Sequence, residues 1–197
     1  MIKRSNLCTA LLDKVVLIML FTLFFMFRLS AQTPRKDSGA NGPTPLQIGD
    51  KVPDTFWTQE HLFFIDGDTV RRNLAQLKGK LLVLDFWSTT CASCIFQQEE
   101  IEFFKKSFAS DIAVVMVNPL KTKDNYDRIQ RFYQRYYKGK QGKHLNTIIL
   151  DGSLQSMFRF MGYPHYVWIN KYEYVQTQTF RNLLDRNYVA PFIDMQP

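Results

Sequence analysis

The sequence is poor in cysteine and contains neither internal repeats nor low-complexity blocks. Only three of its 197 residues are cysteine, which excludes the disulfide framework that stabilises many small secreted domains. Hydrophobic residues make up 46% of the chain and aromatic residues 15%, which is ample for a packed core and excludes a disordered protein. Cys8 lies in a segment that we expect to be removed. This leaves one pair, Cys91 and Cys94, whose spacing is typical of redox or metal chemistry.

A strong excess of one charge is also absent. The formal net charge is +7, and the first 31 residues contribute four basic residues against one acidic residue, so the remainder carries about +4. Much of this excess lies between Lys121 and Lys143, where a solvated helix face and a lysine-rich loop account for it. The charge pattern therefore predicts no nucleic-acid partner.

The chain has no hydrophobic run that would comfortably span a bilayer. Residues 15–27 form an apolar run of 13 residues, with basic residues before it and Leu29-Ser30-Ala31 after it as a small-residue cleavage site. This pattern predicts a signal peptide over residues 1–31 and a periplasmic or otherwise extracytoplasmic location. The alternative is an uncleaved membrane anchor over residues 11–29, which would tether the protein, although Asp13 and Lys14 within it weaken that interpretation.

Residues 32–47 are polar, rich in proline and glycine and without periodicity, which predicts a flexible linker. Residues 48–197 predict one α/β domain: a central mixed β-sheet flanked by helices, with an N-terminal β-hairpin extension. The pattern of apolar residues predicts the following elements in order: hairpin 62–70, short helix 74–80, strand 81–86, helix 91–107, strand 112–117, helix 124–137, strand 147–150, helix 153–161, strands 166–169 and 172–176 turned at Asn170-Lys171, and helix 179–188.

The two cysteines fall where the apolar strand 81–86 passes into the helix 91–107. The first N–H groups of a helix lack intrahelical partners and the helix dipole is positive there, so a sulfur at this position is favoured as thiolate. Thiolate is the form that attacks disulfides. Cys91 lies nearer the helix N-terminus and is the candidate nucleophile, while Cys94, one turn later, is the candidate resolving thiol. A zinc site would need two more ligands, and the spacing of His61, His144 and His165 offers none.

Three features occur together in this sequence: Asp85-Phe86-Trp87, the pair Cys91-x-x-Cys94, and Gly162-Tyr163-Pro164 late in the chain. Together they resemble the thioredoxin superfamily, and most closely its extracytoplasmic TlpA/ResA-like branch. The resemblance covers residues 48–197, about three quarters of the chain, because residues 48–56 also resemble the opening of such domains. It implies a thioredoxin-like fold and thiol–disulfide exchange without a cofactor or metal.

The resemblance also implies roles for individual residues. Asp85 stands where thioredoxins often carry a buried acid; burial would raise its pKa, and its carboxyl could accept and return the proton of Cys94. Pro164 corresponds to the cis-proline that faces the disulfide, so the backbone of Tyr163 could pair with an extended substrate. Trp87 would pack under the active site, although core packing explains it equally well. His165 could lie close enough to the cysteines to favour the thiolate, but the main expectation is a surface histidine at the start of a strand.

The leading hypothesis is an exported thiol–disulfide oxidoreductase that reduces disulfides in other proteins, works as a monomer and is itself reduced by a membrane-bound electron donor. Departures from the branch pattern keep a non-enzymatic binding module with vestigial cysteines as an alternative: Thr90 precedes the first cysteine, Ala92-Ser93 separates the pair, and Gln97 and Glu99 follow. A peroxiredoxin-like peroxidase ranks lower, because Leu84 and Ser88 stand where its motif requires proline and threonine.

Overall fold

The computed structural model of the chain describes residues 14–22 and 44–188. The chain divides into two compact units, residues 1–42 and 43–197. In the first unit residues 14–22 are helical and exposed, and the rest of the predicted signal peptide, with Cys8, lies outside the described residues. Within the described parts of the chain, no helix is long and apolar enough to cross a membrane. Most of the predicted linker is also undescribed, but Leu46 donates its N–H to Met157 O at 2.8 Å and packs on the core of the second unit.

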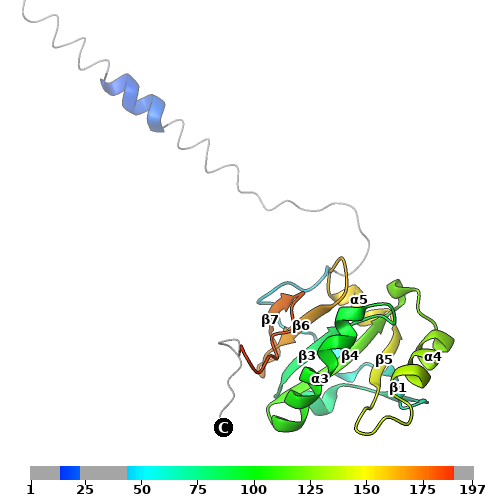
Figure 1. The fold of residues 1–197 in the computed structure, drawn as a ribbon. Helices are drawn as coiled ribbons and strands as arrows, with labels where there is room; N and C mark the ends of the chain where they lie inside the picture. The colour runs from blue at the N-terminus through cyan, green and yellow to red at the C-terminus, as the bar shows by residue number, and fades with distance from the viewer. Residues whose placement is uncertain (1–13, 23–43, 189–197) are drawn as a thin grey trace, which may run out of the picture. The chain divides into compact units, whose positions relative to one another are not determined.

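The second unit is built on one seven-stranded sheet (Figure 1). Its strand order is β2-β1-β5-β4-β3-β6-β7, in which β3, β4 and β5 run parallel and the other neighbours antiparallel. The predicted mixed sheet is confirmed, and the predicted hairpin forms its edge. The strands are β1 His61–Ile65, β2 Asp68–Arg72, β3 Leu81–Phe86, β4 Ile112–Pro119, β5 Asn146–Asp151, β6 His165–Ile169 and β7 Val175–Thr179.

Helices cover both faces of this sheet, as predicted. One apolar cluster joins α2 and α5 to one face, and two others join α3 and α4 to the opposite face. Alternate residues of β3 divide between these faces, since Leu82 and Leu84 pack with α2 and α5 whereas Val83 packs with α3. The helical elements are α2 Asp54–Thr58, η1 Ala75–Leu77, α3 Ala92–Ser107, η2 Leu120–Thr122, α4 Tyr126–Tyr136 and α5 Ser153–Met157.

This alternation determines to which face of the sheet the acidic side chain of β3, Asp85, points. Asp85 lies two residues after Val83 and therefore points to the α3 side of the sheet. Parallel β3 and β4 both end at the edge where α3 begins, so the cysteine pair is at the carboxyl end of the central strands. The predicted position of the pair at a strand-to-helix junction is confirmed.

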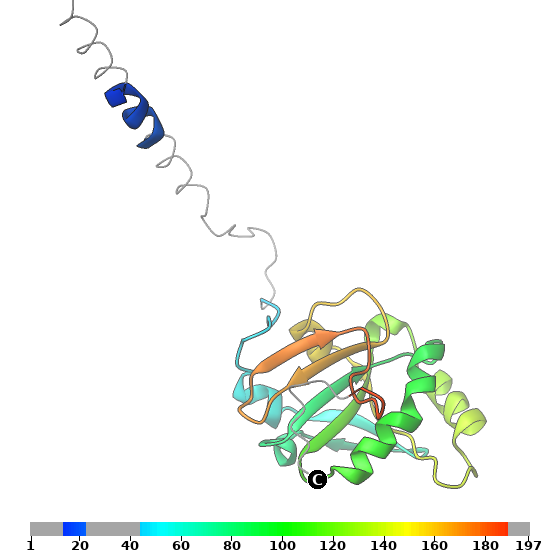
Figure 2. The same cartoon turned by 60° about the vertical axis from the view of Figure 1, so that its left-hand side comes forward.

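The predicted last helix, residues 179–188, is wrong. Residues up to Thr179 belong to β7, and residues 180–188 form bends and a turn beside α3 (Figure 2). Side chains compete here for the backbone groups that a helix would pair: Asn182 bonds to both the N–H and the C=O of Leu184, and Asp185 accepts from Asn187 N. Leu184 still packs with α3, so the segment covers the apolar face without being helical.

The second strand of the last hairpin begins later than predicted. It starts at Val175 rather than at residue 172, and the turn extends over residues 170–174 instead of closing at Asn170-Lys171. The side-chain oxygen of Asn170 accepts the N–H groups of Tyr172 and Tyr174, and Glu173 has a positive φ of 72°. This asparagine-centred turn removes residues 172–174 from the ladder.

Candidate active site

Cys91 and Cys94 form a disulfide at the start of α3. The two sulfurs are 2.02 Å apart and the two Cα atoms 5.3 Å apart. Cys91 is the N-cap residue of α3, where its sulfur accepts the N–H of Cys94 at 3.2 Å and lies 3.5 Å from the Ser93 hydroxyl. These donors would stabilise a thiolate at Cys91 after reduction. Cys91 is 9% exposed and Cys94 1%, the order that an attacking and a resolving thiol require.

Asp85 is the acid that the central strand β3 contributes on the α3 side of the sheet. It is fully buried, and Gln98 Nε2 donates to its Oδ2 at 3.0 Å, while Oδ1 has no hydrogen-bond partner among the described residues. Burial raises the pKa of Asp85 to about 7, against the opposing effects of the Gln98 hydrogen bond and of the Lys105 charge. A carboxyl that titrates near neutral pH can both accept and return a proton, which is the property that the sequence analysis expects of Asp85.

The segment before β6 approaches the cysteines from a distant part of the chain. The Tyr163–Pro164 peptide bond is cis, as the resemblance implies. Tyr163 is partly buried and packs against the cluster that contains Cys91 and Cys94. Burial, with a smaller contribution from the Asp124 charge, raises the pKa of its phenol. The fold therefore brings Tyr163 to the cysteine pair, although 69 residues separate it from Cys94.

Trp87 is completely buried in the same cluster as the two cysteines. Its indole N–H donates to Thr147 Oγ1 at 2.8 Å, and its ring packs on Phe132 of α4 at a centroid distance of 5.1 Å. Both interpretations from the sequence are compatible with this position, because the ring belongs to the core cluster that also contains the two cysteines.

The expectation for His165 is wrong. This histidine is 4% exposed rather than at the surface, and its ring stacks on Phe160 at a centroid distance of 4.6 Å. Burial lowers its pKa, and Nε2 lies 3.2 Å from Gln178 Oε1. The prediction failed because every residue of β6 is buried: its two edges pair with β3 and β7, and both of its faces are covered.

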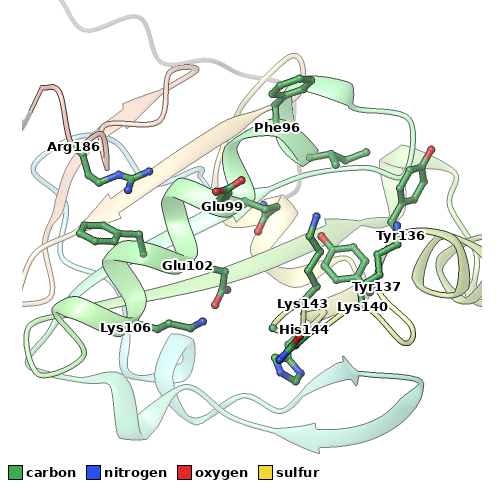
Figure 3. A pocket seen from close by; sticks show the side chains of 15 residues that line it. Phe96, Glu99, Glu102, Lys106, Tyr136, Tyr137, Lys140, Lys143, His144 and Arg186 are labelled. Carbon is green, nitrogen blue, oxygen red and sulfur yellow. The ribbon is translucent and has the colours of Figure 1, made fainter.

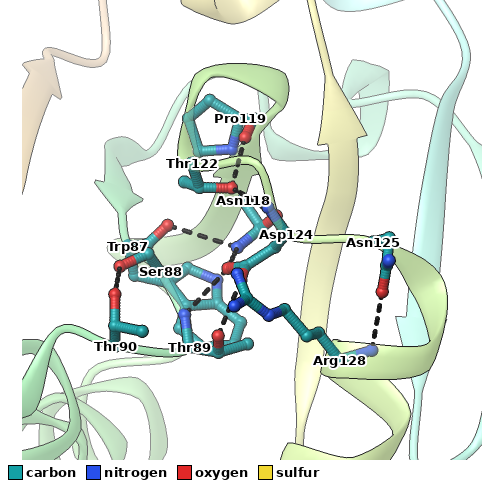
Figure 4. Close-up of polar contacts among 10 residues, drawn as sticks. All are labelled: Trp87, Ser88, Thr89, Thr90, Asn118, Pro119, Thr122, Asp124, Asn125 and Arg128. Carbon is teal, nitrogen blue, oxygen red and sulfur yellow. Dashed lines mark hydrogen bonds and ion pairs between the residues drawn. The ribbon is translucent and has the colours of Figure 1, made fainter.

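Asp124 is a further residue of the site that the sequence analysis missed. It is buried, and its carboxylate accepts the Thr89 N–H at 2.9 Å, the Thr89 hydroxyl at 2.6 Å and Asn118 Nδ2 at 2.8 Å (Figure 4). Arg128 lies 3.8 Å away. Asp124 thus holds the loop that leads to Cys91 against the end of β4. Only its position shortly after a buried strand could have suggested this role.

Replacing Asp124 with alanine is expected to destabilise the protein by about 2–4 kcal/mol, because the buried donors of Thr89 and Asn118 would lose their acceptor. Urea unfolding measures the change. Asp127→Ala is the matched control, since Asp127 is an exposed aspartate three residues later in the first turn of α4. It should cost well under about 1 kcal/mol. Equal losses in the two variants would contradict a specific role for Asp124.

Among the described residues, no group of three His, Cys, Asp or Glu side chains is arranged to hold a metal ion. The three histidines lie in separate surroundings there: His61 pairs with Asp151 at 3.3 Å, His144 with Asp66 at 2.8 Å, and His165 with Gln178.

Comparison with known proteins agrees with this geometry. No family model matches the sequence. The thioredoxin-like protein YneN of Bacillus subtilis is 29% identical over 91 residues, which are 46% of this chain and 49% of that protein. The chain thus spans about half the length of this curated relative. Among solved structures, a mutant of PrxQ from Xylella fastidiosa has a TM-score of 0.50 at 15% identity, covering 69% of this chain and 86% of its own. The chain has a thioredoxin-like fold.

A second similar solved structure is a secreted disulfide oxidoreductase from Mycobacterium tuberculosis, homologous to E. coli DsbE. It has a TM-score of 0.49 at 15% identity and covers 66% of this chain and 88% of its own. The 15% identity to PrxQ shows the fold and nothing finer. What this chain adds is its own site: a close Cys91–Cys94 pair in a thiol–disulfide oxidoreductase-like fold.

Proposed function

We propose that the protein is an exported thiol–disulfide oxidoreductase that reduces disulfides in extracytoplasmic proteins. The observation that carries the proposal is the Cys91–Cys94 disulfide at the N-terminus of α3, with the buried carboxyl of Asp85 linked to Cys94 through Gln98. Inert structural cysteines need neither a helix N-terminus nor a buried acid beside them. Export rests on the N-terminal sequence, with its basic start, apolar run and small-residue cleavage site.

The reaction begins with the reduced pair. The Cys91 thiolate attacks a sulfur of the partner disulfide, a mixed disulfide forms, and the first partner sulfur leaves as a thiolate that takes a proton from water. Asp85 then accepts the proton of Cys94, whose sulfur attacks Cys91 and releases the second partner thiolate, which is also protonated. Two electrons pass from the cysteine pair to the partner. A membrane-bound electron donor would return the pair to the dithiol form.

The segments that carry the pair and the cis-proline also carry exposed apolar side chains suited to a polypeptide substrate. Phe96 on the second turn of α3 is 88% exposed, and Met161, three residues before the cis-proline, is 96% exposed. Large apolar side chains exposed in this way offer contact area to a partner chain. The backbone of Tyr163 would pair with the extended substrate strand, as the superfamily resemblance implies.

The reduction potential of the Cys91–Cys94 couple tests the proposal. The purified protein is equilibrated in glutathione or dithiothreitol buffers, and free thiols are counted by mass-tagging. A reversible couple near about −270 mV, the thioredoxin value, is expected for a reductase. A value near about −120 mV would make the protein an oxidant and overturn the proposed direction. If no reversible couple appears, the oxidoreductase proposal fails and the binding-module alternative replaces it.

A further inference from the structure

Gln98 links the two buried groups of the site. Its side-chain Nε2 donates to Asp85 Oδ2 at 3.0 Å and to the backbone oxygen of Cys94 at 3.2 Å. Cys94 and Gln98 are four residues apart on α3, so the glutamine side chain lies along the helix toward the cysteine. One amide group therefore fixes the carboxyl on β3 relative to the resolving cysteine on α3.

Gln98 also lines a pocket on the α3 side of the sheet (Figure 3). The pocket has a volume of about 630 Å³ and lies between α3 and residues 136–144, with Phe96, Glu102 and Lys106 on its helical side and Tyr136 and Lys140 opposite. Asp85 is not part of its lining and is 0% exposed, whereas Gln98 is only partly buried. The glutamine side chain thus contacts both a water-accessible pocket and the buried carboxyl of Asp85.

We propose that Gln98 is a positioning residue that fixes the Asp85 carboxyl relative to Cys94, and that the pocket behind Gln98 is where this carboxyl exchanges its proton with water. The inference rests on the proposed function. In each turnover Asp85 gains one proton from Cys94 and must lose it before the next. Because Asp85 is fully buried, this loss requires the Gln98 side chain to rotate aside into the pocket.

The charged and titratable groups that face Asp85 come from three elements. Lys105 of α3 favours the carboxylate. The phenols of Tyr137, directly after α4, and of Tyr166 on β6 both have pKa values raised by burial and by the Asp85 charge, so they stay neutral when Asp85 titrates. The hydroxyl of Tyr166 has no described hydrogen-bond partner. Gln98 is therefore the sole hydrogen-bond donor to the carboxyl among the described residues, and its removal should have a measurable effect.

The first test is the titration of Asp85 in the disulfide form, followed by carboxyl ¹³C NMR on the full chain. Gln98→Met keeps a flexible side chain of similar length but removes the N–H donor, so the pKa of Asp85 should rise by about one pH unit. Gln97→Met is the matched control, since the Gln97 side chain contacts Asn182 rather than Asp85. An Asp85 titration that is unchanged in Gln98→Met, or equally shifted in Gln97→Met, would overturn the inference.

The second test is the pH profile of the resolving step, measured by release of a small thiol from the mixed disulfide. In Gln98→Met the rate at pH 7 should fall about fivefold, because about half of Asp85 is ionised in the unchanged protein and about a tenth in the variant. The two rates should converge above pH 9. A deficit that persists at high pH would indicate a structural role and contradict the inference. If the unchanged protein shows no exchange, the proposed function fails instead, and the NMR titration, which needs no partner, reports that separately.

Discussion

Replacing Cys91 with serine abolishes thiol–disulfide exchange, whereas replacing Cys94 with serine traps the partner as a stable mixed disulfide. The expected loss for Cys91→Ser is at least about a hundredfold, because a serine hydroxyl at neutral pH supplies almost none of the anionic nucleophile that the thiol supplies. Cys94→Ser keeps the attacking sulfur at the helix N-terminus but removes the group that would displace the product. Non-reducing electrophoresis with mass spectrometry identifies the trapped species.

Cys8→Ser, in protein that retains residues 1–31, is the control for this pair of variants, because it removes the third cysteine of the chain. It should leave exchange unchanged. If Cys91→Ser trapped the partner and Cys94→Ser did not, the roles assigned from exposure and from the N-cap position would be reversed. If thiol–disulfide exchange continued in both the Cys91→Ser and the Cys94→Ser variants, the enzymatic proposal would be wrong.

The central part of the fold could be predicted because its signals are local. Residues 81–86 are apolar in succession up to Asp85, as in a strand covered on both faces, and the spacing of apolar residues after Cys94 is helical. The structure gives β3 the predicted bounds and begins α3 one residue later, with Cys91 as its cap. The position of the cysteine pair follows from these two elements alone.

The supporting residues could not be predicted, because their roles depend on partners far away in the sequence. Nothing near Asp124 indicates that it will accept hydrogen bonds from Thr89, 35 residues earlier. Gln98 looks like a surface residue of an amphipathic helix until β3 places Asp85 opposite it. The prediction that His165 lies at the surface failed for the same reason, since its burial depends on the strands that pair with β6.

The incorrect prediction of a last helix has a different cause. Residues 179–188 contain helix-compatible spacing, but Asn182 and Asp185 offer the backbone local hydrogen bonds that compete with helical ones. Packing then decides between the helical and the non-helical form. In the non-helical form Leu184 packs in the α3 cluster, and the guanidinium of Arg186 lies 2.8 Å from the Glu100 carboxylate. The sequence pattern is compatible with both the helical and the non-helical conformation, and it does not predict which of the two forms.

Replacing Asp85 with asparagine is expected to stabilise the oxidised protein by about 4 kcal/mol at pH 8 and to change little at pH 4. The pKa of Asp85 is raised from 3.8 to about 7 in the folded state. Between these values the folded chain holds a proton that the unfolded chain has released, so stability falls as pH rises through this window. A pKa difference of about three between the two states, at about 1.4 kcal/mol for each pH unit, gives the expected size. Asparagine has the same shape and no charge, so it removes this penalty.

Urea unfolding of both proteins at pH 4 and pH 8 measures the effect, and Asp68→Asn on the exposed edge strand β2 is the control. If the unfolding free energies of the two proteins differed by the same amount at pH 4 and at pH 8, the raised pKa would not belong to Asp85. The same substitution should slow the resolving step, because Cys94 would lose its proton acceptor. A residue whose replacement makes the protein more stable but less active is retained for its chemistry, since folding alone would favour the asparagine. Opposite signs for stability and activity in one variant would therefore separate a catalytic Asp85 from a merely buried one.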